Sequence, residues 1–262
     1  MPVAEPLPMP KPPPPCPAGA LAAGAAAVAL VALVALLLAP RPAAAADWVG
    51  RFDAGLAPWA ELRFVQNRPA NTWALRRWDG VDALEVRSEG SMSLMARTVE
   101  VDLARTPVLC WRWRIERVLE GADLTRKAGD DQAARVYLGL ALPPERLGVG
   151  DRMALALARA RFGEQVPDAA INYVWDNRQR AGSEHPNAYT GRTTMVVQRS
   201  GGAERGRWVS ERRDVAADIR RLHGPGARLV QLAVGADTDD TGGSALSGFA
   251  ALRFVAPEQP CD

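Results

Sequence analysis

The feature that most restricts the possible folds is residues 109–115, where large apolar side chains alternate with other types. The apolar positions are Leu109, Trp111, Trp113 and Ile115, and the positions between them are Cys110, Arg112 and Arg114. Successive side chains of a β-strand point to opposite faces, so this spacing puts every apolar group on one face. The run therefore predicts a strand with one face in a core, and core packing explains both tryptophans without a ligand.

Other short segments rich in β-branched and aromatic residues are separated by Gly, Pro and Asp, without a series of strong amphipathic helices. This pattern predicts a mainly β fold, a single jelly-roll-like β-sandwich. The predicted strands are residues 61–66, 81–88, 91–97, 107–117, 133–142, 170–175, 193–199, 207–212, 228–236 and 248–255.

Two short helices are expected as connections at the ends or edges of the sandwich, at residues 151–161 and 215–222. The second follows Asp214, a good N-cap residue, and ends at His223-Gly224-Pro225.

Residues 20–39 form an uncharged apolar stretch, and about 20 helical residues cross the hydrocarbon core of a bilayer. Small residues at Ala44 and Ala46 fit a signal-peptidase site before Asp47. Residues 1–46 are therefore a cleaved signal peptide or an uncleaved membrane anchor, and residues 47–262 are the sandwich domain. In both cases the domain is exported, to the periplasm or the extracellular space.

The composition excludes several classes of function. With 32 basic against 30 acidic residues the net charge is only +2, which argues against a nucleic-acid partner. The sequence contains no HExxH, CxxC, Walker, GxGxxG or GxSxG motif, so zinc hydrolysis, nucleotide use and α/β-hydrolase chemistry are disfavoured. A membrane is expected as a partner only through the N-terminal segment.

The cysteines do not indicate a disulfide framework, because Cys16 lies in the leader and only Cys110 and Cys261 remain. These two could pair in an oxidising compartment. A buried free thiol at Cys110 and a free thiol in the C-terminal tail is the favoured alternative.

A first polar cluster precedes and enters a predicted strand, and polar groups at such junctions often form binding sites. Its candidate ligand-binding residues are Lys127, Asp130, Asp131 and Arg135. The alternative is a solvated loop whose charges pair with one another.

A second cluster combines aromatic and amide groups, in the way that sugar-binding surfaces do. Tyr173 and Trp175 share one face of a strand, and Asn187 and Tyr189 follow in a loop. The aromatic pair could equally fill the core of the sandwich.

A third cluster places Asp237, Asp239 and Asp240 in a Gly-rich loop. Alternating carboxylates suit Ca²⁺, which takes about six to eight oxygen ligands, although the spacing differs from that of an EF-hand. An Asx-rich turn without metal is an equal alternative.

Several motifs together resemble the bacterial exported proteins grouped as domain of unknown function 3047. They are WRWRI from Trp111, KAGDDQAARVY from Lys127, NYVW from Asn172, NAYT from Asn187, ERRDVAADIRR from Glu211 and ADTDDTG from Ala236. The resemblance implies a jelly roll like those of carbohydrate-binding or galactose-binding modules, and it implies no activity.

Three functions follow as hypotheses. The first is a non-catalytic domain that binds a glycan or another cell-envelope ligand. The second is a hydrolase or lyase of envelope polysaccharides, in which paired Asp residues such as Asp130 and Asp131 serve as acid and base. The third is a structural scaffold whose charged residues pair internally and leave no cleft.

Export from a bacterial host is expected to yield a chain that begins at Asp47, because signal peptidase cleaves after small residues. Intact-mass spectrometry of the exported protein measures this directly. A full-length chain that sediments with the membrane fraction would instead identify residues 20–39 as an anchor.

Overall fold

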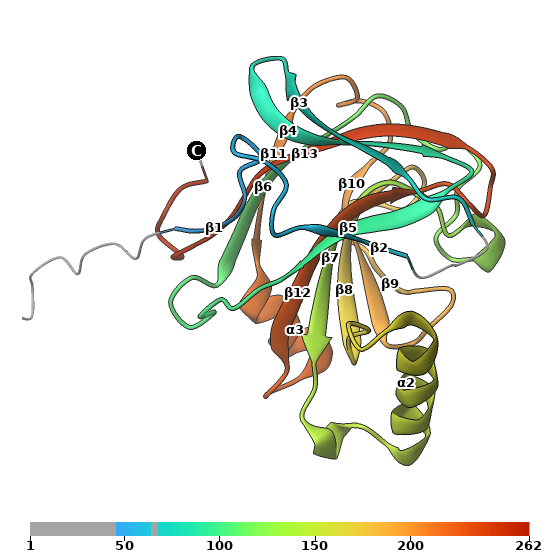
Figure 1. The fold of residues 1–262 in the computed structure, drawn as a ribbon, viewed down its shortest axis with the longest axis vertical. Helices are drawn as coiled ribbons and strands as arrows, with labels where there is room; N and C mark the ends of the chain where they lie inside the picture. Colours follow the sequence, from blue (N-terminus) through green and yellow to red (C-terminus); the bar gives the residue numbers. More distant parts are fainter. Residues whose placement is uncertain (1–45, 64–67, 262) are drawn as a thin grey trace, which may run out of the picture. The chain divides into compact units, whose positions relative to one another are not determined.

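The computed structural model describes residues 46–63 and 68–261, which fold into two β-sheets with two α-helices (Figure 1). The strands are β1 (Asp47–Gly50), β2 (Ala60–Leu62), β3 (Thr72–Trp78), β4 (Val81–Glu89), β5 (Met92–Thr98), β6 (Val108–Ile115), β7 (Gln132–Ala141), β8 (Ala169–Asp176), β9 (Glu184–Pro186), β10 (Thr193–Ser200), β11 (Val209–Asp214), β12 (Arg228–Asp237) and β13 (Ser244–Val255). The helices are α2 (Val149–Phe162) and α3 (Val215–His223), with 3-10 turns η1 (Lys127–Gly129) and η2 (Pro144–Arg146).

The two sheets have different strand orders. In the first sheet the order is β11-β6-β13-β4-β3, and β1 pairs with part of β13. In the second it is β2-β5-β12-β7-β8-β10-β9. Only β8 and β10 run parallel among the strand pairs of the described residues. The predicted mainly β, jelly-roll-like sandwich with two short helices is confirmed.

Aromatic side chains from both sheets meet in the core. The ring of Trp111 on β6 stacks on that of Tyr173 on β8, with centroids 5.6 Å apart and planes 16° apart. The next pair along the same strands, Trp113 and Trp175, has centroids 5.6 Å apart. All four side chains are buried. The predicted apolar face of residues 109–115 is therefore the inner face of the first sheet.

Both predicted helices are present as connections, α2 between β7 and β8 and α3 between β11 and β12. The Asp214 side chain accepts a hydrogen bond from the Ala217 backbone N–H, which confirms its N-cap role. Whereas α3 buries Val215 and Ile219 in the core cluster, α2 buries only Leu155.

The strand prediction was incomplete at the sheet edges. It omitted β1, β3 and β9. Most β3 side chains are exposed, so this edge strand lacks the alternation that marks a half-buried strand, and β1 and β9 are too short to show a period. The predicted strand at residues 61–66 is confirmed to Leu62 and is wrong at Arg63, which is described and lies outside β2. The rest of the predicted strand, residues 64–66, lies outside the described residues.

The predicted leader also lies outside the described residues, except for Ala46. Within the part that is described, no helix is long and apolar enough to span a bilayer.

The favoured prediction of two free thiols was wrong, because Cys110 and Cys261 form a disulfide. Cys110 lies on the outer face of β6 in a small apolar cluster with Val108 and Val255, and the chain after β13 returns to this cluster. Sequence spacing could not reveal the pair, because the two residues are 151 positions apart.

Replacement of Cys261 by serine is expected to lower the free energy of unfolding by about 2–5 kcal/mol, since the cross-link closes a long loop and restricts the unfolded chain. Urea unfolding with and without reductant measures the effect. Reductant should destabilise the wild type and leave Cys261→Ser unchanged. Equal stability of the oxidised wild type and the variant would contradict this expectation.

Candidate functional site

A cavity of about 530 Å³ lies on the outer face of the second sheet. Its floor is formed by side chains that alternate with core residues: Arg135 and Tyr137 on β7, and Asn172 on β8. Tyr137 and Asn172 are directly opposite each other in the antiparallel β7–β8 pair. The inward packing of Val136 and Tyr173 therefore turns these polar residues toward the cavity.

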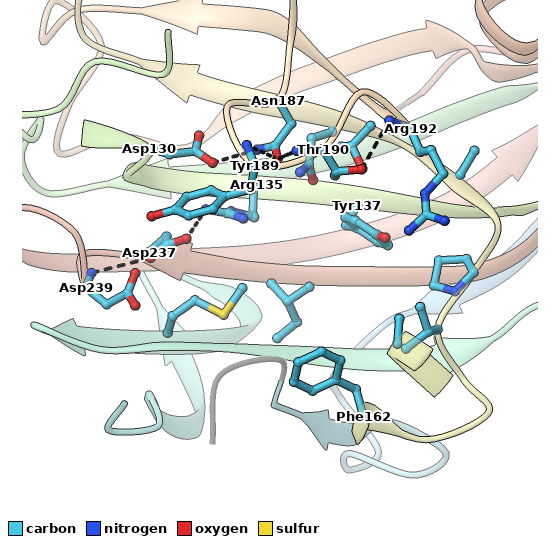
Figure 2. Close-up of a pocket in the computed structure, with 18 of the residues that line it drawn as sticks. Asp130, Arg135, Tyr137, Phe162, Asn187, Tyr189, Thr190, Arg192, Asp237 and Asp239 are labelled. Carbon is cyan, nitrogen blue, oxygen red and sulfur yellow. Dashed lines mark hydrogen bonds and ion pairs between the residues drawn. The ribbon is translucent and has the colours of Figure 1, made fainter. Parts of the chain in front are cut away.

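The walls of the cavity come from segments far apart in the sequence. One side is apolar, formed by Met92 and Leu94 of β5 and by Ala158 and Phe162 of α2. Polar side chains from the loop before β10 and from the end of β12 form the other side. Figure 2 shows Phe162 across the cavity from Asn187, Thr190 and Arg192. A site with polar groups facing an apolar wall suits a ligand that has both kinds of surface.

Arg135 and Asp237 form a buried ion pair beneath the polar side, and each is 5% exposed. Burial raises the pKa of Asp237 well above its usual range, while the nearby charge of Arg135 opposes that rise. Only Nη2 of Arg135 reaches Asp237, and Nε of the same side chain is buried without a hydrogen-bond partner. One of the residues that line the cavity floor therefore holds a buried donor that no protein group satisfies.

Asp130 joins the floor to the loop before β10. Its Oδ2 accepts a hydrogen bond of 2.6 Å from Asn187 Nδ2, and its Oδ1 accepts one of 3.1 Å from Gln132 Nε2. Asn187 Oδ1 in turn accepts from the backbone N–H groups of Tyr189 and Thr190, at 3.1 and 3.2 Å. Burial raises the pKa of the Asp130 carboxyl. Asp130 and Asn187 therefore fix the loop at the cavity.

Tyr189 stands at the mouth of the cavity and is 56% exposed. Its hydroxyl donates to the carboxylate of Asp240, with O–O distances of 2.7 and 2.9 Å, and lies 3.0 Å from the Lys127 carbonyl oxygen. The Lys127 ammonium lies 5.5 Å from the Tyr189 ring centroid. Partial burial and the Asp240 carboxylate raise the pKa of the Tyr189 hydroxyl.

Asp131 contacts a different loop from Asp130, although the two residues are adjacent in the short link between the 3-10 turn η1 and β7. Its carboxylate accepts hydrogen bonds from the backbone N–H groups of Asp240 and Thr241, at 3.1 and 2.8 Å. It lines a different, much smaller cavity. The predicted Asp130–Asp131 pair is therefore not a pair facing one site.

The predicted metal cluster of Asp237, Asp239 and Asp240 differs from the group of carboxylates that the structure brings together. Asp131, Asp239 and Asp240 each offer an oxygen within 4.8 Å of the others, whereas Asp237 pairs with Arg135. Asp239 also lies 3.3 Å from Arg68 Nε. Since these carboxylates already have protein donors, the Ca²⁺ site stays a prediction.

Tyr173 and Trp175 do not reach the cavity, so the prediction that they stack on a ligand was wrong. They are 0% and 2% exposed, between the sheets. The Tyr173 hydroxyl donates to Asp218 at 2.8 Å, and the Trp175 indole N–H donates to the Gly201 carbonyl at 3.0 Å. The aromatic pair fills the core, the alternative that the sequence had left open.

Sequence reasoning missed most of the cavity lining, and the residues missed include Tyr137, Phe162, Asn172 and Arg192. Two of them followed from alternation, because Tyr137 is two positions after Arg135, and Asn172 must face away from Tyr173. Asn172 is 2% exposed, its Oδ1 has no partner, and its Nδ2 has only the weak acceptor Met195 Sδ at 3.6 Å. No sequence pattern pointed to Phe162 or Arg192, because only the tertiary structure brings α2 and the loop before β10 to the cavity.

Comparison with known proteins identifies one family. The profile of the family described as "Protein of unknown function (DUF3047)" matches residues 57–253. No curated protein sequence matches the chain. Among solved structures, the xyloglucanase domain of NopAA, a type three effector from Sinorhizobium fredii in complex with cellobiose, matches with 11% identity and a TM-score of 0.36. That match covers 77% of this chain and 99% of the domain, and at this TM-score it carries no argument.

Arg135→Met is expected to lower the free energy of unfolding by about 3–5 kcal/mol, because it leaves Asp237 buried without a counter-charge. The double variant Arg135→Met, Asp237→Leu should lose less than the single variant, since neither charge remains. Urea unfolding of the wild type and both variants measures these differences. If the double variant were the less stable one, uncompensated charge would not be the source of the loss.

Proposed function

The chain belongs to the DUF3047 family of proteins of unknown function, and we propose that it is an exported, non-catalytic β-sandwich that binds a cell-envelope glycan. The ligand occupies the cavity on the outer face of β7 and β8, which has room for one or two sugar rings. The proposal rests mainly on one observation: Arg135 and Asn172, two deeply buried residues that line the cavity, each hold a buried polar atom without a hydrogen-bond partner. Export is supported by the apolar segment at residues 20–39.

The unfilled atoms have complementary roles. Arg135 Nε is a donor and Asn172 Oδ1 is an acceptor. Leaving a buried polar group unsatisfied costs about 1–3 kcal/mol. A sugar hydroxyl can donate one hydrogen bond and accept others, so a sugar carries the kinds of partner that both atoms lack. Hydrogen bonds from such a ligand would offset the cost of leaving these polar atoms unsatisfied in the free protein.

The rest of the lining also suits a sugar. The C–H faces of a sugar ring can pack on Phe162 and on the apolar side chains of β5, while its hydroxyls face Asp130 and Asn187. Tyr189 at the mouth presents an exposed aromatic ring. The cavity volume of about 530 Å³ lies within the range of about 300–1,000 Å³ that is usual for small-ligand sites.

A second candidate function is that of a hydrolase or lyase that cleaves a polysaccharide. Three carboxyls that line the cavity, those of Asp130, Asp237 and Asp240, have raised pKa values with burial as the first cause. A carboxyl with a raised pKa can act as a general acid. The Arg135 pairing of Asp237 and the role of Asp130 in holding the loop favour binding over catalysis. The scaffold hypothesis expects no cleft beside these charges, and the cavity argues against it.

Binding is tested by filling the cavity from α2 with Ala158→Trp, which leaves every polar group of the floor in place. The bulky ring should weaken glycan binding at least roughly tenfold. Ala154→Trp is the matched control, because Ala154 is exposed on the same helix and lies outside the cavity lining.

A glycan array screened with the purified exported protein, in Ca²⁺ and in chelator, identifies the ligand, and calorimetry measures both variants against it. Equal affinity of Ala158→Trp and Ala154→Trp would place the site elsewhere. Glycan turnover by the wild type that is lost in Asp130→Asn would support the hydrolase instead.

A further inference from the structure

The cations that line the cavity are not equivalent. Arg135 is paired with Asp237, and Arg68 lies 3.3 Å from Asp239. The third cation, Arg192, has no ion-pair partner among residues 46–63 and 68–261, and its Nη1 is buried without any hydrogen bond. Asp168 also lines the cavity, but its carboxylate forms an ion pair with Arg159 at 2.8 Å and accepts a hydrogen bond from the Leu142 N–H.

The backbone of Arg192 is fixed at the edge of the cavity. Its carbonyl accepts a hydrogen bond of 3.0 Å from the Ala170 N–H of β8, and its own N–H donates to Thr190 Oγ1 at 3.3 Å. These hydrogen bonds fix the backbone from which the Arg192 side chain extends. Figure 2 shows its guanidinium beside Tyr137, on the side opposite Arg135. The charges of Arg135 and Arg192 both act on the Tyr137 hydroxyl.

The two ends of the cavity thus differ in charge. At the Tyr189 end, Asp130 and Asp240 receive hydrogen bonds from neutral side chains, Asn187 and Gln132 for the first and Tyr189 for the second. At the other end, Arg192 lacks a counter-charge and faces a mainly apolar wall that includes Phe162 and Pro167. An anion would be repelled at the first end and attracted at the second.

We propose that the ligand is an acidic sugar whose anionic group, a carboxylate or a phosphate, binds Arg192. The planar guanidinium fork matches both groups, and charge-assisted hydrogen bonds are stronger than neutral ones. With the anion at Arg192, the ring lies over Tyr137 and its hydroxyls face Asn172 and Arg135. This inference rests on the proposed glycan function and adds the charge and the orientation of the sugar.

The test uses sugars that differ only at C6: glucose, glucuronic acid and glucose 6-phosphate, and the same three forms of galactose. Acidic and neutral glycans on the array extend the comparison to longer chains. Calorimetry on the purified exported protein should show acidic members bound at least roughly tenfold more tightly than their neutral partners. Preference for the carboxylate or for the phosphate identifies which anion the site takes.

Arg192→Gln should remove the preference for acidic sugars and keep the affinity for neutral ones, because the substitution removes the charge and breaks no ion pair within residues 46–63 and 68–261. Arg180→Gln changes the net charge equally at an exposed position outside the cavity and should keep the preference. An unchanged preference in Arg192→Gln, or equal binding of acidic and neutral sugars by the wild type, overturns the inference and leaves glycan binding standing. Binding of no sugar at all overturns both.

Discussion

The packing of Trp111 and Trp113 against Tyr173 and Trp175 determines how the second sheet is oriented. Once these rings fill the space between the sheets, β8 has only one possible rotation about its own axis. Asn172 must then face outward, and the register of β7 places Tyr137 beside it. The aromatic core thereby selects which polar residues of this sheet line the cavity, although none of these four core rings lines it.

The outer face of this sheet carries polar groups that an ordinary protein surface would leave in water. Arg135, Asp237 and Asn172 are each at most 5% exposed, yet Arg135 Nε and Asn172 Oδ1 have no hydrogen-bond partner within the protein. A buried ion pair contributes little net stability, because desolvation offsets its attraction. Local features that cost stability are most common at functional sites, which supports the proposal that this face binds a ligand.

The adjacent residues Asp130 and Asp131 each hold a different loop beside this face. Asp131 binds the backbone of Asp240 and Thr241 and so holds the turn between β12 and β13. Asp130 binds Asn187 and holds the loop before β10. Because the two carboxylates, which lie between η1 and β7, bind different partners, one short stretch of chain fixes two loops that are far apart in the sequence.

Local pattern was enough to predict most strands, both helices, the Asp214 cap and the inner face of β6, because alternation, helical spacing and capping are properties of a few adjacent residues. It also brought out the cavity residues Asp130, Arg135, Asn187 and Tyr189, since polar groups at strand junctions are visible in the sequence. The tertiary structure alone decided that Tyr173 and Trp175 are core, that Cys110 pairs with Cys261, and that Phe162 and Arg192 meet at one cavity. These outcomes depend on which face of a strand the opposite sheet covers and on contacts between distant segments, and neither is encoded in the spacing of neighbouring residues.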